Sequence, residues 1–266
     1  MASEADVLHA INPLYSLSGL VVGMLVGFTG VGGGALMTPL LVLLFGIHPS
    51  AAVGTDLLYA GLTKISGSAV HGYNGAIDWK VVRRLALGSA PAATLTLIAL
   101  SVLGQGSNVA SHVITTTLGF ALLMTAVTLL FRKWLIGHYG AMLERASERR
   151  IAAMTTGLGV ILGVLVTLSS VGAGAIGVTA LLMLYPKMPT VRLVGSDIAH
   201  AVPLTLIAGT GHWWIGSVNF PLLFSLLIGS IPGIMIGSHF AARVPDRVLR
   251  PLLAGTLALI GVRMAF

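Results

Sequence analysis

Two glycine-rich segments interrupt long apolar runs at corresponding places in this chain. The first covers residues 29–35 and the second covers residues 169–175. Glycine clusters disfavour a continuous helix and let the backbone bend or approach a ligand closely. Inside a bilayer, such a break is tolerated only where protein covers it or where it lines a watery cavity. Paired apolar segments interrupted by glycine are the best sequence indication of a transporter's binding site.

The composition defines the class of protein. Of the 266 residues, 56% are hydrophobic and only 9% are charged, with a mean hydropathy of +0.96. These values exclude a soluble globule and predict an all-α, polytopic helical membrane protein. The pI of about 10.3 does not indicate nucleic-acid binding, because the basic residues stand at the ends of apolar runs. The chain has no cysteine, which excludes a thiolate nucleophile and cysteine metal ligands.

The second half of the chain repeats the first. With Ala35 aligned on Ala175, and one residue inserted just after Pro189, special residues of the two halves coincide in one register, which indicates an internal repeat. The coincident residues are Gly54-Thr55-Asp56 with Gly195-Ser196-Asp197, His71 with His212, Gly75 with Gly216, Asp78 with Asn219, and Gly88-Ser89-Ala90-Pro91 with Gly229-Ser230-Ile231-Pro232.

The repeat and the charges predict the domain organisation. We expect a first transmembrane repeat over residues 1–131, a basic cytoplasmic linker over 132–150 and a second repeat over 151–266. Each repeat would contain a glycine-broken pair of short helices and three full spans. In the simplest crossing pattern nearly all the basic residues fall on one side, which the positive-inside tendency makes cytoplasmic. The halves would then be inverted repeats. The charges leave open whether the chain has eight membrane elements or ten.

The motifs around the glycine breaks resemble a known family. Residues 27–34, Pro39 and Pro49 followed by 52–56 are similar to the first repeat of the sulfite exporter TauE/SafE family. The second copy, with Pro189 before residues 194–197, is similar to the family's degenerate second repeat. The resemblance implies a multi-pass protein of the bacterial inner membrane that moves sulfur-containing anions, such as sulfite or organosulfonates.

Backbone and hydroxyl groups beside the two breaks are the candidate substrate ligands. The short helix after each break would direct its unpaired N–H groups at the break, and this end of a helix attracts anions. Lys64, in the middle of an apolar segment, would add positive charge, or would instead form an ion pair with Asp56 or Asp197. The candidate residues are Thr29, Gly32, Gly33, Gly34, Lys64, Ser169, Ser170, Gly172 and Gly174. Ser169, Ser170 and Thr29 would alternatively satisfy carbonyls freed by the breaks.

Asp56 and Asp197 are the acidic residues that lie inside apolar segments. One interpretation is a carboxylate that takes up a proton or a cation during a transport cycle. The other is helix N-capping, in which Thr55 or Asp56, and Ser196 or Asp197, accept backbone N–H bonds where a new helix begins. His200 follows Asp197 by nearly one helical turn and would share a proton with it.

These features predict a secondary transporter for small sulfur oxyanions or sulfonates, working by alternating access and coupled to protons. Its expected partners are the anion and the lipid bilayer. We expect no enzyme activity, catalytic residue, metal site or cofactor. Two alternatives are a passive anion channel and an intramembrane hydrolase, the latter with Asp56 and Asp197 as a dyad.

Overall fold

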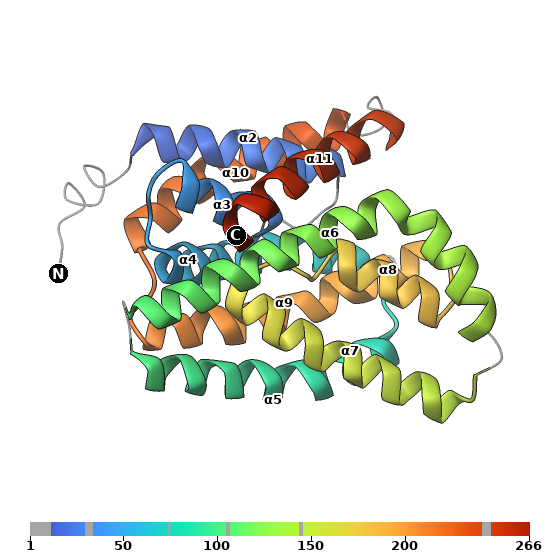
Figure 1. Ribbon diagram of the computed structural model, residues 1–266. Coiled ribbons are helices and arrows are strands. Elements are labelled where there is room, and N and C mark those ends of the chain that lie inside the picture. The colour runs from blue at the N-terminus through green and yellow to red at the C-terminus, as the bar shows by residue number, and fades with distance from the viewer. Residues whose placement is uncertain (1–11, 30–33, 74, 105–106, 144–145, 241–245) are drawn as a thin grey trace.

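The computed structural model describes residues 12–29, 34–73, 75–104, 107–143, 146–240 and 246–266. The regular elements of these residues are all α-helices (Figure 1). They are α2 (Pro13–Thr29), α3 (Gly34–Leu43), α4 (Pro49–Tyr73), α5 (Trp79–Leu103), α6 (Asn108–Leu143), α7 (Glu148–Ser169), α8 (Ala175–Leu184), α9 (Thr190–Trp214), α10 (Phe220–Phe240) and α11 (Asp246–Ala265).

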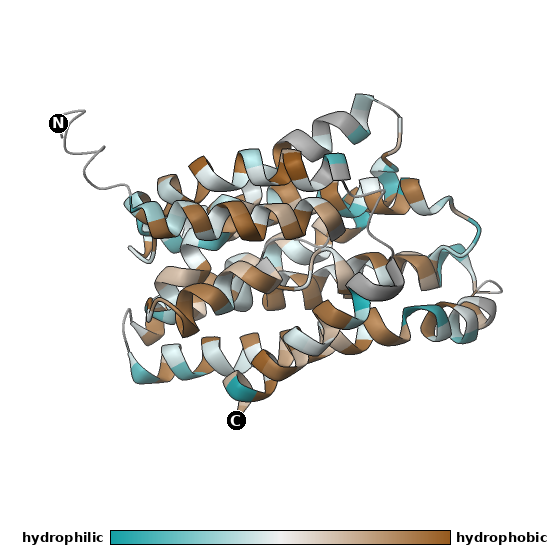
Figure 2. Cartoon of the chain, turned by 90° about the horizontal axis from the view of Figure 1, so that it is seen from above, coloured by the Kyte–Doolittle hydropathy of each residue, from teal (hydrophilic) through white to brown (hydrophobic). Residues whose placement is uncertain are grey.

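The helices have the length and surface of membrane spans. Within the described residues, five are long and apolar enough to cross a bilayer, and α2 and α8 are shorter apolar helices. Large hydrophobic side chains such as Leu87, Leu95 and Ile98 of α5 are exposed on the outside of the bundle. In Figure 2, brown hydrophobic residues run along the helices, and hydrophilic ones gather towards the connections. The expected all-α, polytopic membrane fold is therefore confirmed.

Glycines bring α2 against α10 and α5 against α7 in two close, parallel pairs. On α10, Gly229, Gly233 and Gly237 recur every four residues and abut the α2 backbone at Ser16, Leu20 and Met24, respectively. A spacing of four residues places small side chains on one face of a helix, so the two backbones approach closely. In the other pair, Gly88 of α5 and the glycines Gly159 and Gly163 of α7 make the same kind of contact.

Helices α4 and α9 form the antiparallel core of the bundle. Gly61 of α4 faces Thr205 of α9, and Gly209, one turn further along α9, faces Leu58 of α4. Residue numbers thus rise along one helix as they fall along the other. Residues 52–61 of α4 are all buried, because the parallel pairs and α6 enclose this core (Figure 1).

The repeated Gly-Thr/Ser-Asp motifs hold the two halves together by a reciprocal exchange. The Thr55 hydroxyl on α4 accepts a hydrogen bond from the Asn219 N–H at 3.0 Å. At the matching place the Ser196 hydroxyl on α9 accepts one from the Asp78 N–H at 2.8 Å. Asp78 and Asn219 themselves cap α5 and α10 through their side chains. Each motif therefore fixes the start of a helix in the opposite half.

The histidines that coincide in the repeat lie at the same two junctions. Gly195 is in contact with the Ala76 carbonyl and with the His71 ring. Gly54 is in contact with the Ser217 carbonyl and with His212, whose Nε2 lies 3.0 Å from the Thr167 carbonyl oxygen. Both rings thus lie at interfaces between the halves. His71 lies beside the contact of the α4–α5 connection with Gly195, and His212 lies beside the contact of the α9–α10 connection with Gly54.

One expectation needs correction. Helices α4 and α9 begin at Pro49 and Thr190, so Thr55, Asp56, Ser196 and Asp197 lie inside these helices and cannot cap them. Proline is well tolerated in the first helical turn, where its missing N–H costs nothing. The segment 132–150 is also mostly helical, because α6 continues to Leu143 and α7 starts at Glu148.

Candidate functional site

The second glycine break ends one helix and starts another inside the bundle. Ser170 follows α7 in the left-handed conformation, with φ 59° and ψ 3°, and its N–H donates to the Val166 carbonyl at 2.8 Å. Gly172 and Gly174 have φ values of 131° and 121°, which L-residues with a side chain rarely adopt. These two glycines reverse the chain so that α8 begins at Ala175 next to α9.

Part of the first break lies outside the described residues. This holds for Gly32, Gly33 and the side chain of Thr29, whereas Gly34 is the first residue of α3. The structure therefore describes the two halves of the predicted site unequally, and the second break carries most of the geometry.

The Ser169 hydroxyl satisfies backbone groups at the break. Its Oγ donates to the Leu165 carbonyl at 2.6 Å and accepts from the Val171 N–H at 3.2 Å. The side chain is fully buried. Ser169 therefore stabilises the bend, as the alternative interpretation of this residue predicts.

Asp197 lies at the N-terminus of α8. The backbone N–H of Gly174, the residue that precedes α8, lies close to its carboxylate, and a Cβ on Gly177 would collide with Asp197 Oδ1. The residue is 1% exposed, and Oδ1 has no hydrogen-bond partner among the described residues. The capping interpretation thus named the wrong helix: Asp197 belongs to α9 but binds the positive end of α8.

Asp56 lies beside α3 and the second break. Its Oδ2 accepts a hydrogen bond from the Thr38 hydroxyl at 2.5 Å, and the Thr38 backbone N–H also lies near the carboxylate. Ser170 lies close to Asp56, but Asp56 Oδ1 and Ser170 Oγ, both buried, have no hydrogen-bond partner in the described part of the chain. Asp56 and Ser170 thus form a buried polar pair between the halves, and each can accept or donate a further hydrogen bond.

Lys64 supplies positive charge to both carboxylates. Its ammonium group interacts electrostatically with Asp197 and with Asp56. Among the described residues it forms no ion pair within 4.0 Å, and it is partly exposed. Because this lysine lies in a membrane helix and has no ion-pair partner at contact distance among the described residues, its ammonium group can bind an anion. The direct ion-pair interpretation of Lys64 is not supported by this geometry.

A second polar layer lies one turn beyond each carboxylate. His200 Nε2 of α9 is 2.8 Å from Ser89 Oγ of α5. In the repeat register the matching residues are Tyr59 of α4 and Ser230 of α10, which are neighbours, although neither hydroxyl makes a hydrogen bond within the described chain. Sequence reasoning selected His200 but missed Tyr59, Thr38 and both serines. The register already aligned Ser89 with Ser230, and it could have found Tyr59.

The repeat offers a matched test of this layer. We expect Ser89→Ala to lower the free energy of unfolding by about 1–2 kcal/mol, because it leaves His200 Nε2 buried without a partner. Ser230→Ala should cost less than about 0.5 kcal/mol, because its hydroxyl makes no bond to lose. Denaturant titration of each purified variant in detergent measures both values. Equal losses in the two variants would contradict this assignment of the bond.

The assembled site is a buried set of charges where the two halves meet. No hydrogen bond joins Asp56 to Asp197 among the described residues, and each carboxylate has its own partners: Thr38 for Asp56, and the start of α8 for Asp197. Such intramembrane charges line substrate or ion pathways. Fold and site together define a polytopic helical membrane protein with charged residues where its two halves meet.

Comparison with known proteins identifies the family. The model of the family "Sulfite exporter TauE/SafE" matches residues 15–264, so the chain belongs to this family of membrane transporters. The chain is 39% identical over 251 residues to the probable membrane transporter protein YjnA of Bacillus subtilis (strain 168), covering 93% of this chain and 97% of that protein.

More distant relatives carry the same description. The probable membrane transporter protein YdhB of Bacillus subtilis (strain 168) is 28% identical over 92% of this chain and 97% of its own length. The protein MJ0441 of Methanocaldococcus jannaschii, also named a probable membrane transporter, is 26% identical over 95% of this chain and 94% of its own. No solved structure matches the chain. The protein is a multi-pass membrane transporter and not an enzyme, which removes the hydrolase alternative.

Proposed function

We propose that this transporter carries small sulfur-containing oxyanions, such as sulfite or an organosulfonate, and that protons accompany them. The observation that carries the proposal is Asp197 at the N-terminus of α8, with Lys64 nearby. A helix N-terminus and a lysine without a contact partner are groups that bind a tetrahedral or pyramidal oxyanion well. In the described structure a carboxylate of the protein itself holds this position.

Competition between Asp197 and the substrate gives a mechanism for coupling. An ionised Asp197 and an anion cannot share the α8 N-terminus without strong repulsion. Protonation removes the negative charge of Asp197 and frees the Gly174 N–H and Lys64 for the substrate. Proton binding therefore favours anion binding, and by linkage the reverse holds. The anion and the proton would cross the membrane in the same direction.

Helix packing supports alternating access between two inverted repeats. The pair α2 with α10 and the pair α7 with α5 correspond in the repeat register, and both pairs are parallel. The central helices α4 and α9, which also correspond, are antiparallel. This pattern is what a two-fold axis in the membrane plane produces. Rocking of one half against the other would expose Asp197 and Asp56 to alternate sides, with the basic end of the bundle in the cytoplasm.

Uptake into liposomes that contain the pure protein tests the proposed substrate class. We expect saturable uptake of sulfite or a sulfonate, inhibited by other sulfur oxyanions, and at least about tenfold slower uptake of chloride, because the chloride ion lacks directed acceptor oxygens. Empty liposomes provide the background. Unsaturable uptake of every anion at similar rates would instead favour a passive channel.

Lys64 provides the sharpest single substitution for the substrate site. We expect Lys64→Ala to lower the rate of sulfur-anion uptake by about tenfold or more, because the removed charge is one of the few that face the site. Lys64→Arg should retain more than half of the rate. Lys133→Ala removes an exposed lysine on α6, away from the site, and should change nothing. Similar rates in Lys64→Ala and Lys133→Ala would contradict a role in substrate binding.

A further inference from the structure

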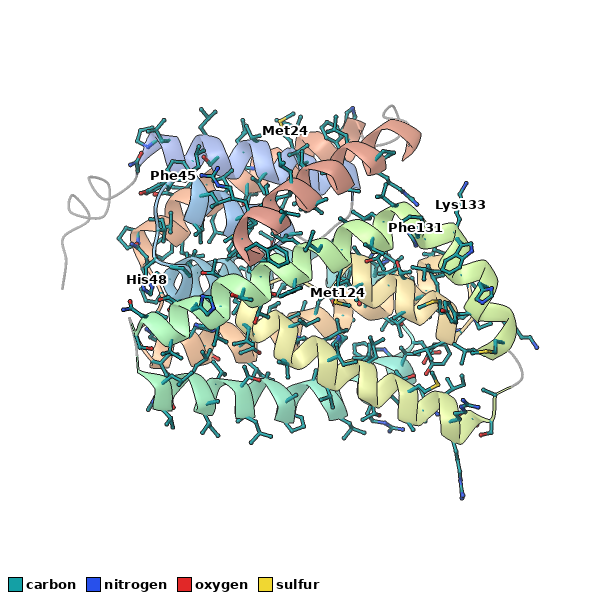
Figure 3. All side chains as sticks on the ribbon, in the orientation of Figure 1. Met24, Phe45, His48, Met124, Phe131 and Lys133 are labelled. Atoms are coloured by element: carbon teal, nitrogen blue, oxygen red, sulfur yellow. The ribbon has the colours of Figure 1, made fainter. Side chains whose placement is uncertain are left out.

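A cavity lies at the basic end of the bundle, away from the glycine breaks. Its volume is about 590 Å³, and it opens between the first turns of α5 and α7 and the connection from α8 to α9. This end carries Lys133, opposite the end that carries His48 (Figure 3). The charged residues that line it are Lys80, Arg84, Lys187, Arg192, Asp78 and Glu148. Four cations against two carboxylates give the cavity an excess of positive charge.

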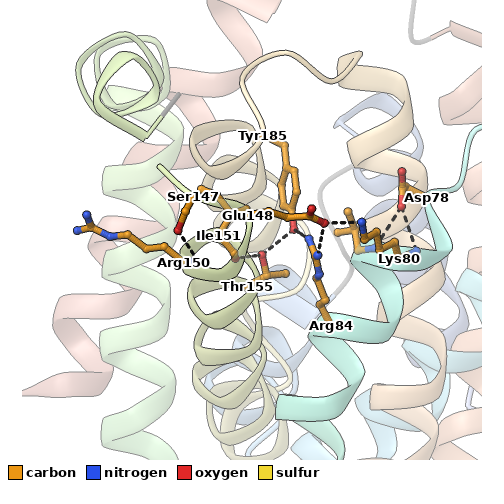
Figure 4. A network of polar contacts seen from close by, with 10 residues as sticks. Asp78, Lys80, Arg84, Ser147, Glu148, Arg150, Ile151, Thr155 and Tyr185 are labelled. Atoms are coloured by element: carbon orange, nitrogen blue, oxygen red, sulfur yellow. Dashed lines mark hydrogen bonds and ion pairs between the residues drawn. The ribbon is translucent and has the colours of Figure 1, made fainter. Parts of the chain in front are cut away.

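The cations are held by a built polar network (Figure 4). Arg84, whose side chain is 15% exposed, donates to the Tyr185 hydroxyl at 3.2 Å, and that hydroxyl lies 2.8 Å from Thr155 Oγ1. Glu148 forms ion pairs with Arg84 at 2.9 Å and with Lys80 at 2.5 Å. Tyr185 and Thr155 thus fix the guanidinium, while Glu148 occupies the acceptor position that an external anion would take.

The ion pairs at the mouth of the cavity are open to exchange. The side chains of Lys80 and Glu148 are 57% and 68% exposed, and Arg192, half-exposed, lies 3.8 Å from Asp78. Exposed ion pairs contribute little net free energy, so a competing anion can replace the carboxylate at small cost. The guanidinium of Arg84 offers planar, paired donors that suit a phosphate group.

The internal repeat shows that the fold alone does not require this cavity. In the other half, the register aligns Tyr185 with Phe45 and Thr155 with Tyr15, and these two rings pack edge to face with centroids 4.9 Å apart. Arg84 aligns with Ser225, Lys187 with Ile47 and Arg192 with Ala51. Among the described residues, these aligned positions carry no charged side chain. The repeat therefore does not reproduce the charged cavity.

The level of the cavity along the membrane normal favours a lipid over a soluble ligand. Trp79 precedes Lys80 at the start of α5 and is exposed. Exposed Trp134 and Tyr139 lie on the last part of α6. Tryptophan and tyrosine collect at the level of lipid headgroups, and basic pockets between helices on the cytoplasmic side bind anionic headgroups. We propose that this cavity binds the phosphate group of an anionic phospholipid.

Lipid binding to the purified full-length protein in detergent tests the proposal, by native mass spectrometry with phosphatidylglycerol, phosphatidylcholine and inorganic phosphate. We expect phosphatidylglycerol to bind at least about tenfold more tightly than phosphatidylcholine, and the double variant Lys80→Gln/Arg192→Gln to lose about tenfold of that affinity. The matched variant Arg83→Gln/Arg150→Gln removes two exposed cations from the same end, outside the cavity, and should lose less than about threefold.

A gain of binding separates the proposal from simple loss of structure. Glu148→Gln removes the competing carboxylate, so we expect tighter phosphatidylglycerol binding than in the unaltered protein. Equal losses in the two double variants would overturn the cavity as the site. Displacement of phosphatidylglycerol by inorganic phosphate, with no preference between the two lipids, would assign the cavity to a soluble phosphate and overturn the lipid. Binding is read on the isolated protein, so the result does not depend on the transport proposal.

Discussion

Asp197→Asn is expected to abolish the response of anion uptake to a pH gradient. The amide preserves the shape of the side chain and its position beside the start of α8, but it cannot take up a proton. An imposed gradient, acidic on the side of the anion, should accelerate uptake by the unaltered protein by about 10–100-fold, the usual range of coupling between two ligands. In the variant, the rates with and without the gradient should agree.

The matched control for this substitution is Asp78→Asn. Asp78 caps α5 through its side chain, and its repeat counterpart Asn219 caps α10 in the same way. An amide is therefore adequate at that position, and the variant should keep its pH response. Exchange of sulfur anion across liposomes at equal pH should persist in Asp197→Asn, which shows that the protein is folded. A gradient response that survives in Asp197→Asn would exclude Asp197 as the proton carrier.

Gly195→Ala and Gly54→Ala are expected to destabilise the fold severely although each adds one carbon atom. A Cβ on Gly195 would collide with the Ala76 carbonyl, and one on Gly54 with the Ser217 carbonyl. These atoms belong to the backbone of connections that the Thr55 and Ser196 hydroxyls hold in place, so they cannot move aside freely. We expect losses of about 3 kcal/mol or more in the free energy of unfolding.

Gly157→Ala supplies the opposite expectation in the same protein. Gly157 lies inside α7, and nothing lies within 4 Å of a Cβ built there. Alanine favours a helix over glycine by about 1 kcal/mol, so this variant should be neutral or slightly stabilised. Thermal unfolding in detergent and the yield of monodisperse protein measure all three variants. Stable, monodisperse Gly195→Ala would show that the connection over Gly195 shifts easily.

Local sequence was sufficient for the class of fold and for the positions of the breaks. Apolar runs bounded by charge predict membrane helices because the bilayer demands internal hydrogen bonding of every span. The break around Gly172 and Gly174 was visible because only glycine adopts their backbone conformation readily. The register between the halves aligned Thr55 with Ser196 and Asp78 with Asn219, and these residues are partners across the halves.

The error concerned where helices begin, which local sequence specifies only weakly. Asp56 and Asp197 were expected to cap the starts of new helices, but α4 begins at Pro49 and α9 at Thr190, and the fixed φ of proline suits such helix starts. Both aspartates therefore lie in helix interiors. The segment 132–150, predicted as a linker, is largely helical, because α6 continues to Leu143 and α7 begins at Glu148.

The sequence by itself determined that the chain crosses a membrane as helices and that α7 and α8 are separated at a glycine cluster, and it predicted an internal repeat. Each of these properties depends on neighbours along the chain. Only the tertiary structure decided that Asp197 faces the start of α8, that Thr38 and Ser170 accompany Asp56, and that a charged cavity forms between α5, α7 and the connection from α8 to α9. These partners stand on different helices, and no local pattern of side chains encodes which helix faces will meet.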